Sequence, residues 1–277
     1  MKKINNVLIV ACSVLINTAY SQQPIPYPVA HKSSVEDVYF DVRVPDPYRW
    51  LEDDQGTDTY AWVKQQNELT NSYLAKIPFR DTLKQRMTAL WNYQKYMPPF
   101  NATSRYFYYK NNGLQNQPIL FMMKSLQFVP MEYFDPNKIS ADGTTAITQT
   151  VPSMDGKYMA FVLSNSGSDW SEIRIKEVAT MKSCPEKIGW VKFSAVAWRD
   201  SGFFYSRYNP LRGDENMLTV KNENHKIVYH QLNQKQEEDS LIYEDRNHPL
   251  RTFTANTTED ERYLVITGAE STRPPEP

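Results

Sequence analysis

Adjacent acidic side chains are the first candidates for acid–base chemistry in this sequence. Glu52 is followed by Asp53, and Glu237 and Glu238 form a run with Asp239. Two carboxylates can serve as a catalytic acid and base when their surroundings hold the two pKa values apart. Both groups lie in polar stretches, where neighbouring carboxylates typically form a solvated face. We therefore expect no acid–base pair at either position.

Histidine side chains would be needed for a transition-metal site of the common kind. The four histidines show no close ligand spacing and no carboxylate companions in a motif: His31, His225, His230 and His248. His225 and His230 are five residues apart in an expected strand and loop, so they point to different faces. The sequence therefore predicts no metal ion.

The spacing of the glycines shows whether the sequence contains the motif of a serine nucleophile or a nucleotide-binding loop. The nucleophile elbow G-x-S-x-G needs two glycines four residues apart, and none of the nine glycines are so spaced. The same lack excludes the glycine-rich loops that hold ATP phosphates or dinucleotides. We therefore expect no catalytic residue in this chain and no cofactor.

The strand-rich elements that would position any site are repeated along the chain. Residues 153–156 form a turn signal before an alternating strand that starts at Tyr158. Further copies of this unit occupy residues 104–109, 200–205 and 258–265. The anchor aromatics of the four copies are 52, 45 and 60 residues apart: Tyr106, Tyr158, Phe203 and Tyr263. This period is typical of β-propeller blades, and an antiparallel sandwich is the alternative.

Helical periodicity occurs only before this strand-rich part. A helix is expected over residues 56–75, with Asp58 as its N-cap and Trp62 on its apolar face. A second helix is expected from Pro78, with one apolar stripe: Phe79, Leu83, Met87, Leu90 and Trp91. Both faces must be covered, by the following strands or by another domain. We therefore predict an extended and helical segment at residues 22–91 and a strand-rich part at residues 92–277.

The first 21 residues have the pattern of a signal peptide. Two lysines, Lys2 and Lys3, precede an apolar run over residues 7–16, and a small residue at Ser21 ends a cleavage signal. The run is too short to anchor the chain in a bilayer, so we expect no transmembrane segment. Secretion or periplasmic export with cleavage near Ser21 is predicted, and lipid anchoring at Cys12 is the alternative.

Charge and cysteine content exclude two further classes of protein. Removal of the signal peptide takes away two lysines and moves the net charge from −1 to −3. No basic patch remains, so nucleic acid is not an expected partner. Cys184 is then the only cysteine, so no intramolecular disulfide can form.

Several short segments carry a family resemblance. They include Asp-Pro-Tyr-Arg-Trp-Leu-Glu-Asp at 46–53, Gly-Ser-Asp-Trp at 167–170 and Val-Lys-Phe-Ser at 191–194, together with residues 106–117, 135–144 and 153–158. Taken in the order in which they occur along the chain, they resemble the N-terminal part of the prolyl oligopeptidases, serine endopeptidases that cleave short peptides after proline. The resemblance covers about residues 27–271, and residues 273–277 do not share it.

The resemblance implies a mainly β chain that forms a partial seven-bladed β-propeller of about three and a half blades. It also implies that the N-terminal helical segment packs on an α/β-hydrolase domain that this chain lacks. That domain would be the chain's partner and would hold the Ser-Asp-His triad, so this chain alone is expected to be inactive. Short proline-containing peptides would be the substrates of the complete enzyme.

Two residues of the matching segments receive a role from the resemblance. Phe193 is expected to line the substrate pocket, and a core aromatic residue in an edge strand is the alternative. Asp169 is expected to face the hydrolase domain and pair with an arginine beside its active site. The alternative for Asp169 is a turn aspartate that caps its own backbone. Trp170 is expected to be a packing residue.

Two other functions stay open at the level of sequence. A non-catalytic secreted propeller that binds peptides or proteins would need a complete ring of blades. A non-functional remnant would expose a strand edge and the apolar faces of the two helices, and it would aggregate. The prediction we carry forward is the N-terminal part of a secreted prolyl oligopeptidase-like serine endopeptidase.

Overall fold

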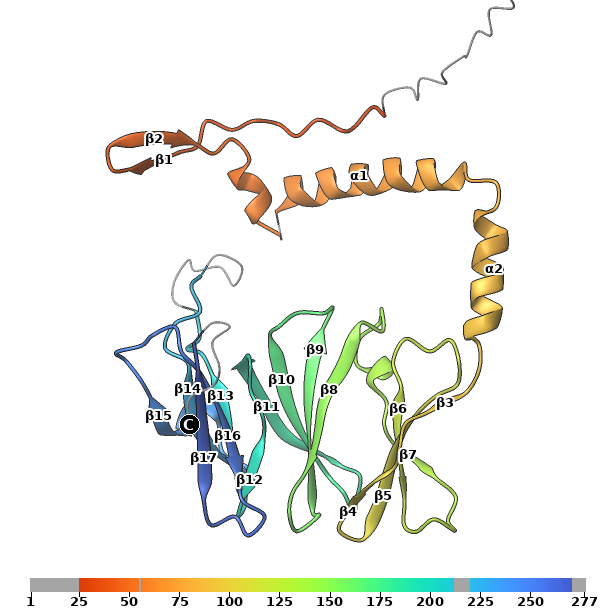
Figure 1. Cartoon of the computed structure of the whole chain (residues 1–277), viewed down its shortest axis with the longest axis vertical. Coiled ribbons are helices and arrows are strands. Elements are labelled where there is room, and N and C mark those ends of the chain that lie inside the picture. Colours follow the sequence, from red (N-terminus) through yellow and green to blue (C-terminus); the bar gives the residue numbers. More distant parts are fainter. Residues whose placement is uncertain (1–24, 55, 212–219, 271–277) are drawn as a thin grey trace, which may run out of the picture. The chain divides into compact units, whose positions relative to one another are not determined.

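A computed structural model describes residues 25–54, 56–211 and 220–270 (Figure 1). The chain divides into two compact units, one ending at Pro78 and the other beginning at Phe79. The predicted signal peptide and residues 273–277 lie outside the described residues. The predicted division at residues 91–92 remains a prediction.

The first unit contains a hairpin and one long helix. Its elements are β1 (Glu36–Tyr39), β2 (Val42–Pro45), the short 3₁₀ helix η1 (Arg49–Glu52) and α1 (Thr57–Ala75). The hairpin turn consists of Phe40 and Asp41, both with positive φ. Helix α1 confirms the expected helix, but its N-cap is Gly56 and no side chain caps it, so Asp58 lies within the first turn.

The second unit begins with α2 (Arg80–Trp91), and its strands form antiparallel blades. The first blade contains β4 (Phe100–Ala102), β5 (Arg105–Asn111), β6 (Ile119–Met123) and β7 (Met131–Phe134), with β3 (Lys95–Tyr96) beside β5. The second contains β8 (Thr145–Pro152), β9 (Tyr158–Asn165), β10 (Ser171–Glu177) and β11 (Ser183–Val191). The third contains β12 (Ala197–Arg199), β13 (Gly202–Arg207), β14 (Lys226–Gln231) and β15 (Ser240–Glu244). A fourth begins with β16 (Thr252–Thr257) and β17 (Leu264–Ala269), and the short 3₁₀ helices are η2 (Pro136–Lys138) and η3 (Gln236–Glu238).

The predicted repeat is visible in the hydrogen bonds of its turns. In the second blade the Ser153 hydroxyl donates to Asp155 at 2.8 Å and accepts from the Tyr158 amide at 3.0 Å. In the fourth, the Thr258 hydroxyl donates to Asp260 at 2.5 Å and accepts from the Tyr263 amide at 3.2 Å. The same turn therefore starts the second strand of both blades.

Cores between successive blades confirm the propeller over the sandwich. Strand β9 is buried on both faces, because Met159 and Phe161 pack toward the first blade while Ala160 and Val162 pack toward the third. A further cluster joins the third blade to Phe253 of the fourth. The described part of the chain is thus mainly β, and its strands form three blades, side by side in Figure 1, followed by the hairpin β16–β17. Each blade is held by its neighbour rather than by one central core.

The apolar stripe of α2 is not covered by the strands of its own unit. Leu83, Met87, Leu90 and Trp91 are all exposed. An apolar helix face of this kind is typical of a surface that another part of a protein covers. Among the described helices, none combines the length and apolar character needed to cross a membrane.

Candidate functional site

The structure brings Phe193 and Asp169 together through a lysine to which the sequence analysis gave no role. Ser171 of β10 pairs with Val191 of β11. The β9–β10 turn therefore lies beside the β11–β12 connection, at the same end of these strands. The Lys192 ammonium lies 3.6 Å from the Asp169 carboxylate and 5.2 Å from the centre of the Phe193 ring. Its side chain is 12% exposed, whereas that of Asp169 is 69% exposed.

Phe193 is presented to solvent by an unusual backbone. The residue is 54% exposed and lies outside any strand, so it is not a core residue of this unit. Phe193 has φ 53° and Trp190, three residues earlier, has φ 59°. Bulky residues rarely adopt the left-handed region, and such strain is concentrated at functional sites. The backbone here is held in a conformation that local preference opposes.

Asp169 lies in the β9–β10 turn, and Trp170 follows it directly. The Trp170 amide donates to the Ser168 hydroxyl at 3.1 Å, so Ser168 supplies the local cap in this turn. Lys192 lies over the Trp170 ring at 5.3 Å from its centre. Trp170 therefore packs in the same cluster as Phe193, and its ring also meets those of Trp190 and Tyr208 edge to face.

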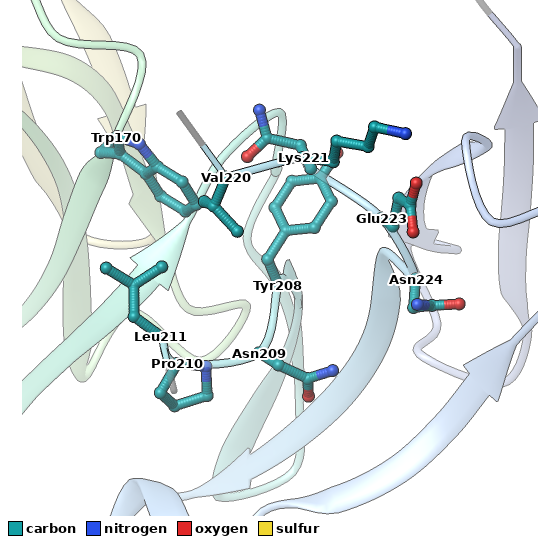
Figure 2. Close-up of a pocket in the computed structure, with 10 residues that line it drawn as sticks. Trp170, Tyr208, Asn209, Pro210, Leu211, Val220, Lys221, Glu223 and Asn224 are labelled. Atoms are coloured by element: carbon teal, nitrogen blue, oxygen red, sulfur yellow. The ribbon is translucent and has the colours of Figure 1, made fainter. Parts of the chain in front are cut away.

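A pocket of about 330 Å³ adjoins this cluster (Figure 2). Trp170 from the second blade and Tyr208 from the third form part of its wall. The two rings meet edge to face with centres 5.9 Å apart. The Tyr208 amide donates to the Trp190 carbonyl at 3.0 Å, which ties the pocket to the strained segment.

Hydrogen bonds from a 3₁₀ helix and from another strand hold the segment around Phe193. Gln236 binds both backbone groups of Gly189, accepting from its amide at 3.1 Å and donating to its carbonyl at 2.8 Å. The side-chain amide of Gln149 donates to the Ser194 carbonyl at 3.0 Å. Side chains of η3 and β8 therefore stabilise a backbone that the segment's own residues would not favour.

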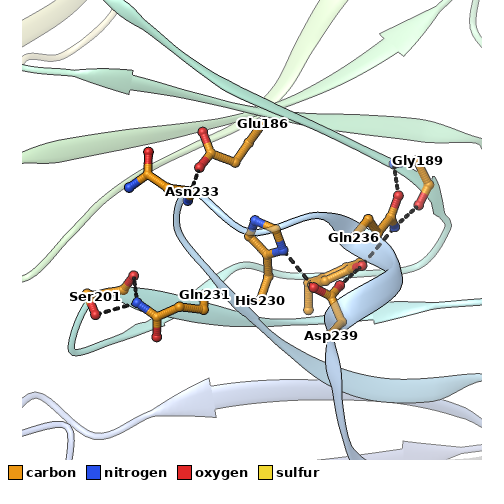
Figure 3. Close-up of polar contacts among 9 residues, drawn as sticks. Glu186, Gly189, Ser201, His230, Gln231, Asn233, Gln236 and Asp239 are labelled. Carbon is orange, nitrogen blue, oxygen red and sulfur yellow. Dashed lines mark hydrogen bonds and ion pairs between the residues drawn. The ribbon is translucent and has the colours of Figure 1, made fainter.

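A buried polar network lies behind Gln236 (Figure 3). Its side-chain amide donates to the Tyr205 hydroxyl at 2.8 Å, and that hydroxyl donates to Asp239 at 2.6 Å. The other Asp239 oxygen lies 2.6 Å from Nδ1 of His230, and the two side chains are 4% and 0% exposed. The expectation of a solvated acidic face at residues 237–239 is wrong for Asp239, because the fold buries it against the neighbouring strands.

His225 is the second buried histidine and is held neutral. The Phe253 amide donates to Nδ1 at 2.8 Å, so the ring proton is on Nε2, which lies 2.9 Å from the Lys192 carbonyl. Burial lowers the pKa of His225 to about 4. Both nitrogens are therefore used only in the neutral form, and protonation would break the bond to Phe253.

This arrangement predicts an acid-sensitive contribution of His225 to stability. Below pH 6.5 the unfolded chain binds a proton at His225, whereas the folded chain does not until about pH 4. The stabilisation is therefore complete above pH 6.5 and is lost as the pH falls. We expect urea unfolding to show that the unmodified chain loses about 2–3 kcal/mol more than His225→Gln between pH 7 and pH 4.5. An equal loss in both chains would contradict the neutral assignment.

The described residues do not assemble a catalytic centre. His230 and Asp239 have the geometry of the histidine–acid half of a triad, but Nε2 of His230 is buried and has no hydrogen-bond partner among them. No hydroxyl nucleophile can therefore be activated there. No group of three or more metal-ligating side chains occurs in the described part of the chain.

These features define a class of protein before any relative is considered. Short antiparallel blades packed face to face, with one edge that displays aromatic and charged side chains, make the chain part of a β-propeller. The family model described as "Prolyl oligopeptidase, N-terminal beta-propeller domain" matches residues 27–276. The chain therefore belongs to the prolyl oligopeptidase family, through its N-terminal β-propeller domain.

Relatives with a known name support this membership. The chain is 39% identical to a prolyl endopeptidase of Elizabethkingia meningoseptica over 96% of its own length and 38% of the relative's. It is 33% identical to prolyl oligopeptidase A of Amanita bisporigera over 88% of its length and 36% of the relative's. A solved structure of prolyl oligopeptidase B from Galerina marginata, bound to a 25mer macrocyclization substrate, aligns with TM-score 0.72 and 29% identity over 89% of this chain and 38% of that one. The chain thus spans well under half the length of these relatives.

Proposed function

We propose that this chain is the N-terminal part of an exported prolyl oligopeptidase-like serine endopeptidase that cleaves short peptides after proline. In this proposal the chain supplies the propeller side of the substrate site. The observation that carries it is the contact of Lys192 with both Phe193 and Asp169, in the exposed connections at one end of the blade strands. The export part rests on the signal-peptide pattern, and N-terminal sequencing of the exported chain should begin at Gln22.

Phe193 and Asp169 have different roles in this proposal. Phe193 offers an exposed ring to an apolar part of the peptide, and Lys192 holds that ring from one side. Asp169 offers an exposed carboxylate to a cation on the hydrolase domain, which would arrive beside an already positioned Lys192. The hydrolase domain would contribute the serine, histidine and aspartate that attack the prolyl carbonyl.

The proposal predicts a loss of substrate binding in Phe193→Ala. A chimaera in which this chain replaces the matching part of the Elizabethkingia meningoseptica endopeptidase should cleave a chromogenic Gly-Pro peptide. Phe193→Ala should lower kcat/KM about tenfold to a hundredfold, mainly by raising KM, because burial of one aromatic ring on the substrate is lost. The purified chain alone should release no chromophore.

The control for this experiment is another exposed phenylalanine. Phe128 is also exposed. It lies in the β6–β7 turn, which is at the opposite end of the blade strands from the end that carries the β9–β10 turn. Phe128→Ala should leave kcat/KM unchanged. Equal effects of the two substitutions, or none from Phe193→Ala, would remove Phe193 from the substrate site.

A further inference from the structure

Both backbone groups of Phe253, in β16, are bound by residues of the third blade. The Phe253 amide donates to Nδ1 of His225 at 2.8 Å, and the Phe253 carbonyl accepts from the Ser206 hydroxyl at 2.7 Å. All three residues are buried. Because buried backbone groups are nearly always paired, these two bonds fix His225 and Ser206 against β16.

His225 and Ser206 also bind the segment that carries Phe193. Nδ1 of His225 accepts from an amide, so the ring proton is on Nε2, which donates to the Lys192 carbonyl at 2.9 Å. The Ser206 amide donates to the Ser194 hydroxyl at 2.7 Å. Lys192 and Ser194 are the neighbours of Phe193 in the chain. The segment is therefore held on both sides of Phe193 by residues that β16 fixes.

The bond from His225 acts on the peptide group that precedes Phe193. The Lys192 carbonyl belongs to this group, and a peptide group is planar. Fixing the direction of its carbonyl therefore restricts rotation about the N–Cα bond of Phe193, which is the angle φ. Phe193 has φ 53°, in a region that bulky residues rarely adopt. The His225 bond thus opposes the return of Phe193 to an ordinary backbone conformation.

The His225 ring cannot follow the carbonyl if the segment moves. His225 is 1% exposed, and its ring centre lies 4.6 Å from that of Tyr208 and 6.5 Å from that of Phe253. The preceding residue is also held, because the Asn224 amide donates to the Pro249 carbonyl at 2.8 Å. Nε2 of His225 is therefore a donor with a fixed position and direction.

We propose that His225 is a positioning residue for Phe193, which sets where the aromatic ring meets the substrate peptide. It acts through one hydrogen bond, from Nε2 to the Lys192 carbonyl, and the bond from Phe253 keeps the proton on that nitrogen. That Phe193 contacts a peptide rests on the proposed function. Through His225, β16 contributes to the placement of a side chain that belongs to the connection between β11 and β12.

Two substitutions of His225 separate the tasks of its two nitrogens. His225→Gln keeps a donor near the position of Nε2, whereas His225→Asn keeps an acceptor near the position of Nδ1. Each variant loses one buried bond, so urea unfolding should show similar losses of stability. In the chimaera with the Elizabethkingia meningoseptica endopeptidase, His225→Asn should raise KM for the Gly-Pro peptide about tenfold with kcat nearly unchanged. His225→Gln should keep KM within about twofold. Equal changes of KM in the two variants overturn the proposal.

The Phe193→Ala background shows whether His225 acts through the Phe193 ring. When the ring is absent, adding His225→Asn should change KM by less than about twofold, because no ring is left to position. The same rise of KM in both backgrounds would give His225 a general structural role and overturn the proposal.

The unmodified chain provides a test that requires no substitution. Heteronuclear NMR of the full chain at neutral pH, with the His225 ring assigned through its backbone, should show the proton on Nε2 and none on Nδ1. A proton on Nδ1 alone overturns the proposal, because Nε2 could then not donate to Lys192. This measurement decides the matter if His225→Asn does not fold.

The outcome is separable from that of the proposed function. If Phe193→Ala raises KM while His225→Asn does not, the substrate site stands and the role of His225 fails. The Phe193 amide resonance of the full chain gives a readout without substrate, and it should move in His225→Asn but not in His225→Gln. If it does so while Phe193→Ala leaves KM unchanged, His225 positions Phe193 and the proposed substrate site fails.

Discussion

Replacing Asp239 with alanine is expected to lower the free energy of unfolding by about 3–5 kcal/mol. The Asp239 carboxylate accepts bonds from the Tyr205 hydroxyl and from Nδ1 of His230, and both partners are buried. Its removal leaves two buried donors without an acceptor, which costs far more than the loss of an exposed contact. Urea unfolding followed by circular dichroism measures this change in free energy. The m value, which is the slope of that free energy against urea concentration, should stay the same.

A second histidine–aspartate pair in the same chain provides the control. His248 lies 2.8 Å from Asp245, at nearly the same distance as the buried pair, but its side chain is half exposed. Water can replace the partner of an exposed group, so His248→Ala should shift the urea midpoint only slightly. Similar shifts of the urea midpoint for Asp239→Ala and His248→Ala would show that burial does not determine how much the Asp239 contacts contribute to stability.

The second large effect is expected for Gly202→Ala. A Cβ atom at Gly202 would lie 2.3 Å from the backbone oxygen of His230 and 2.5 Å from the Tyr229 hydroxyl. Both atoms belong to β14, which pairs with β13 through Gly202 itself, so the two strands would have to separate at this end. We expect a loss of about 3 kcal/mol or more and a fall of roughly 6–12 °C in the thermal midpoint.

The control for this substitution is a glycine with open space around it. A Cβ atom at Gly189 would meet nothing within 4 Å, and its φ lies outside the region that favours glycine. Gly189→Ala should therefore leave the thermal midpoint nearly unchanged. A larger loss for Gly189→Ala than for Gly202→Ala would contradict the packing between β13 and β14.

The repeated turn shows what local sequence could determine. The hydroxyl of Ser153 or Thr258 and the carboxylate two residues later form the same bonds in both copies, so the pattern carries its own structure. The strand expected from Tyr158 likewise follows its turn directly, as β9. These features depend on residues within a few positions of one another.

The candidate site could be predicted only in part. The segments 167–170 and 191–194 drew attention to Asp169 and Phe193 through a family resemblance. No pattern in the sequence indicated that Lys192, between them in the fold, contacts both. Trp170 and Tyr208 share no motif in the sequence, and they line one pocket only where the second and third blades meet.

The sequence by itself thus determined the blades, their turns and the family, because periodicity and turn chemistry act between near neighbours. Only the tertiary structure decided which polar residues are buried. Asp239 follows two exposed glutamates and looks like them in the sequence, yet Tyr205 and His230 from β13 and β14 enclose it. Burial of a side chain depends on strands distant in the sequence, and it is this burial that separates Asp239 from Glu238.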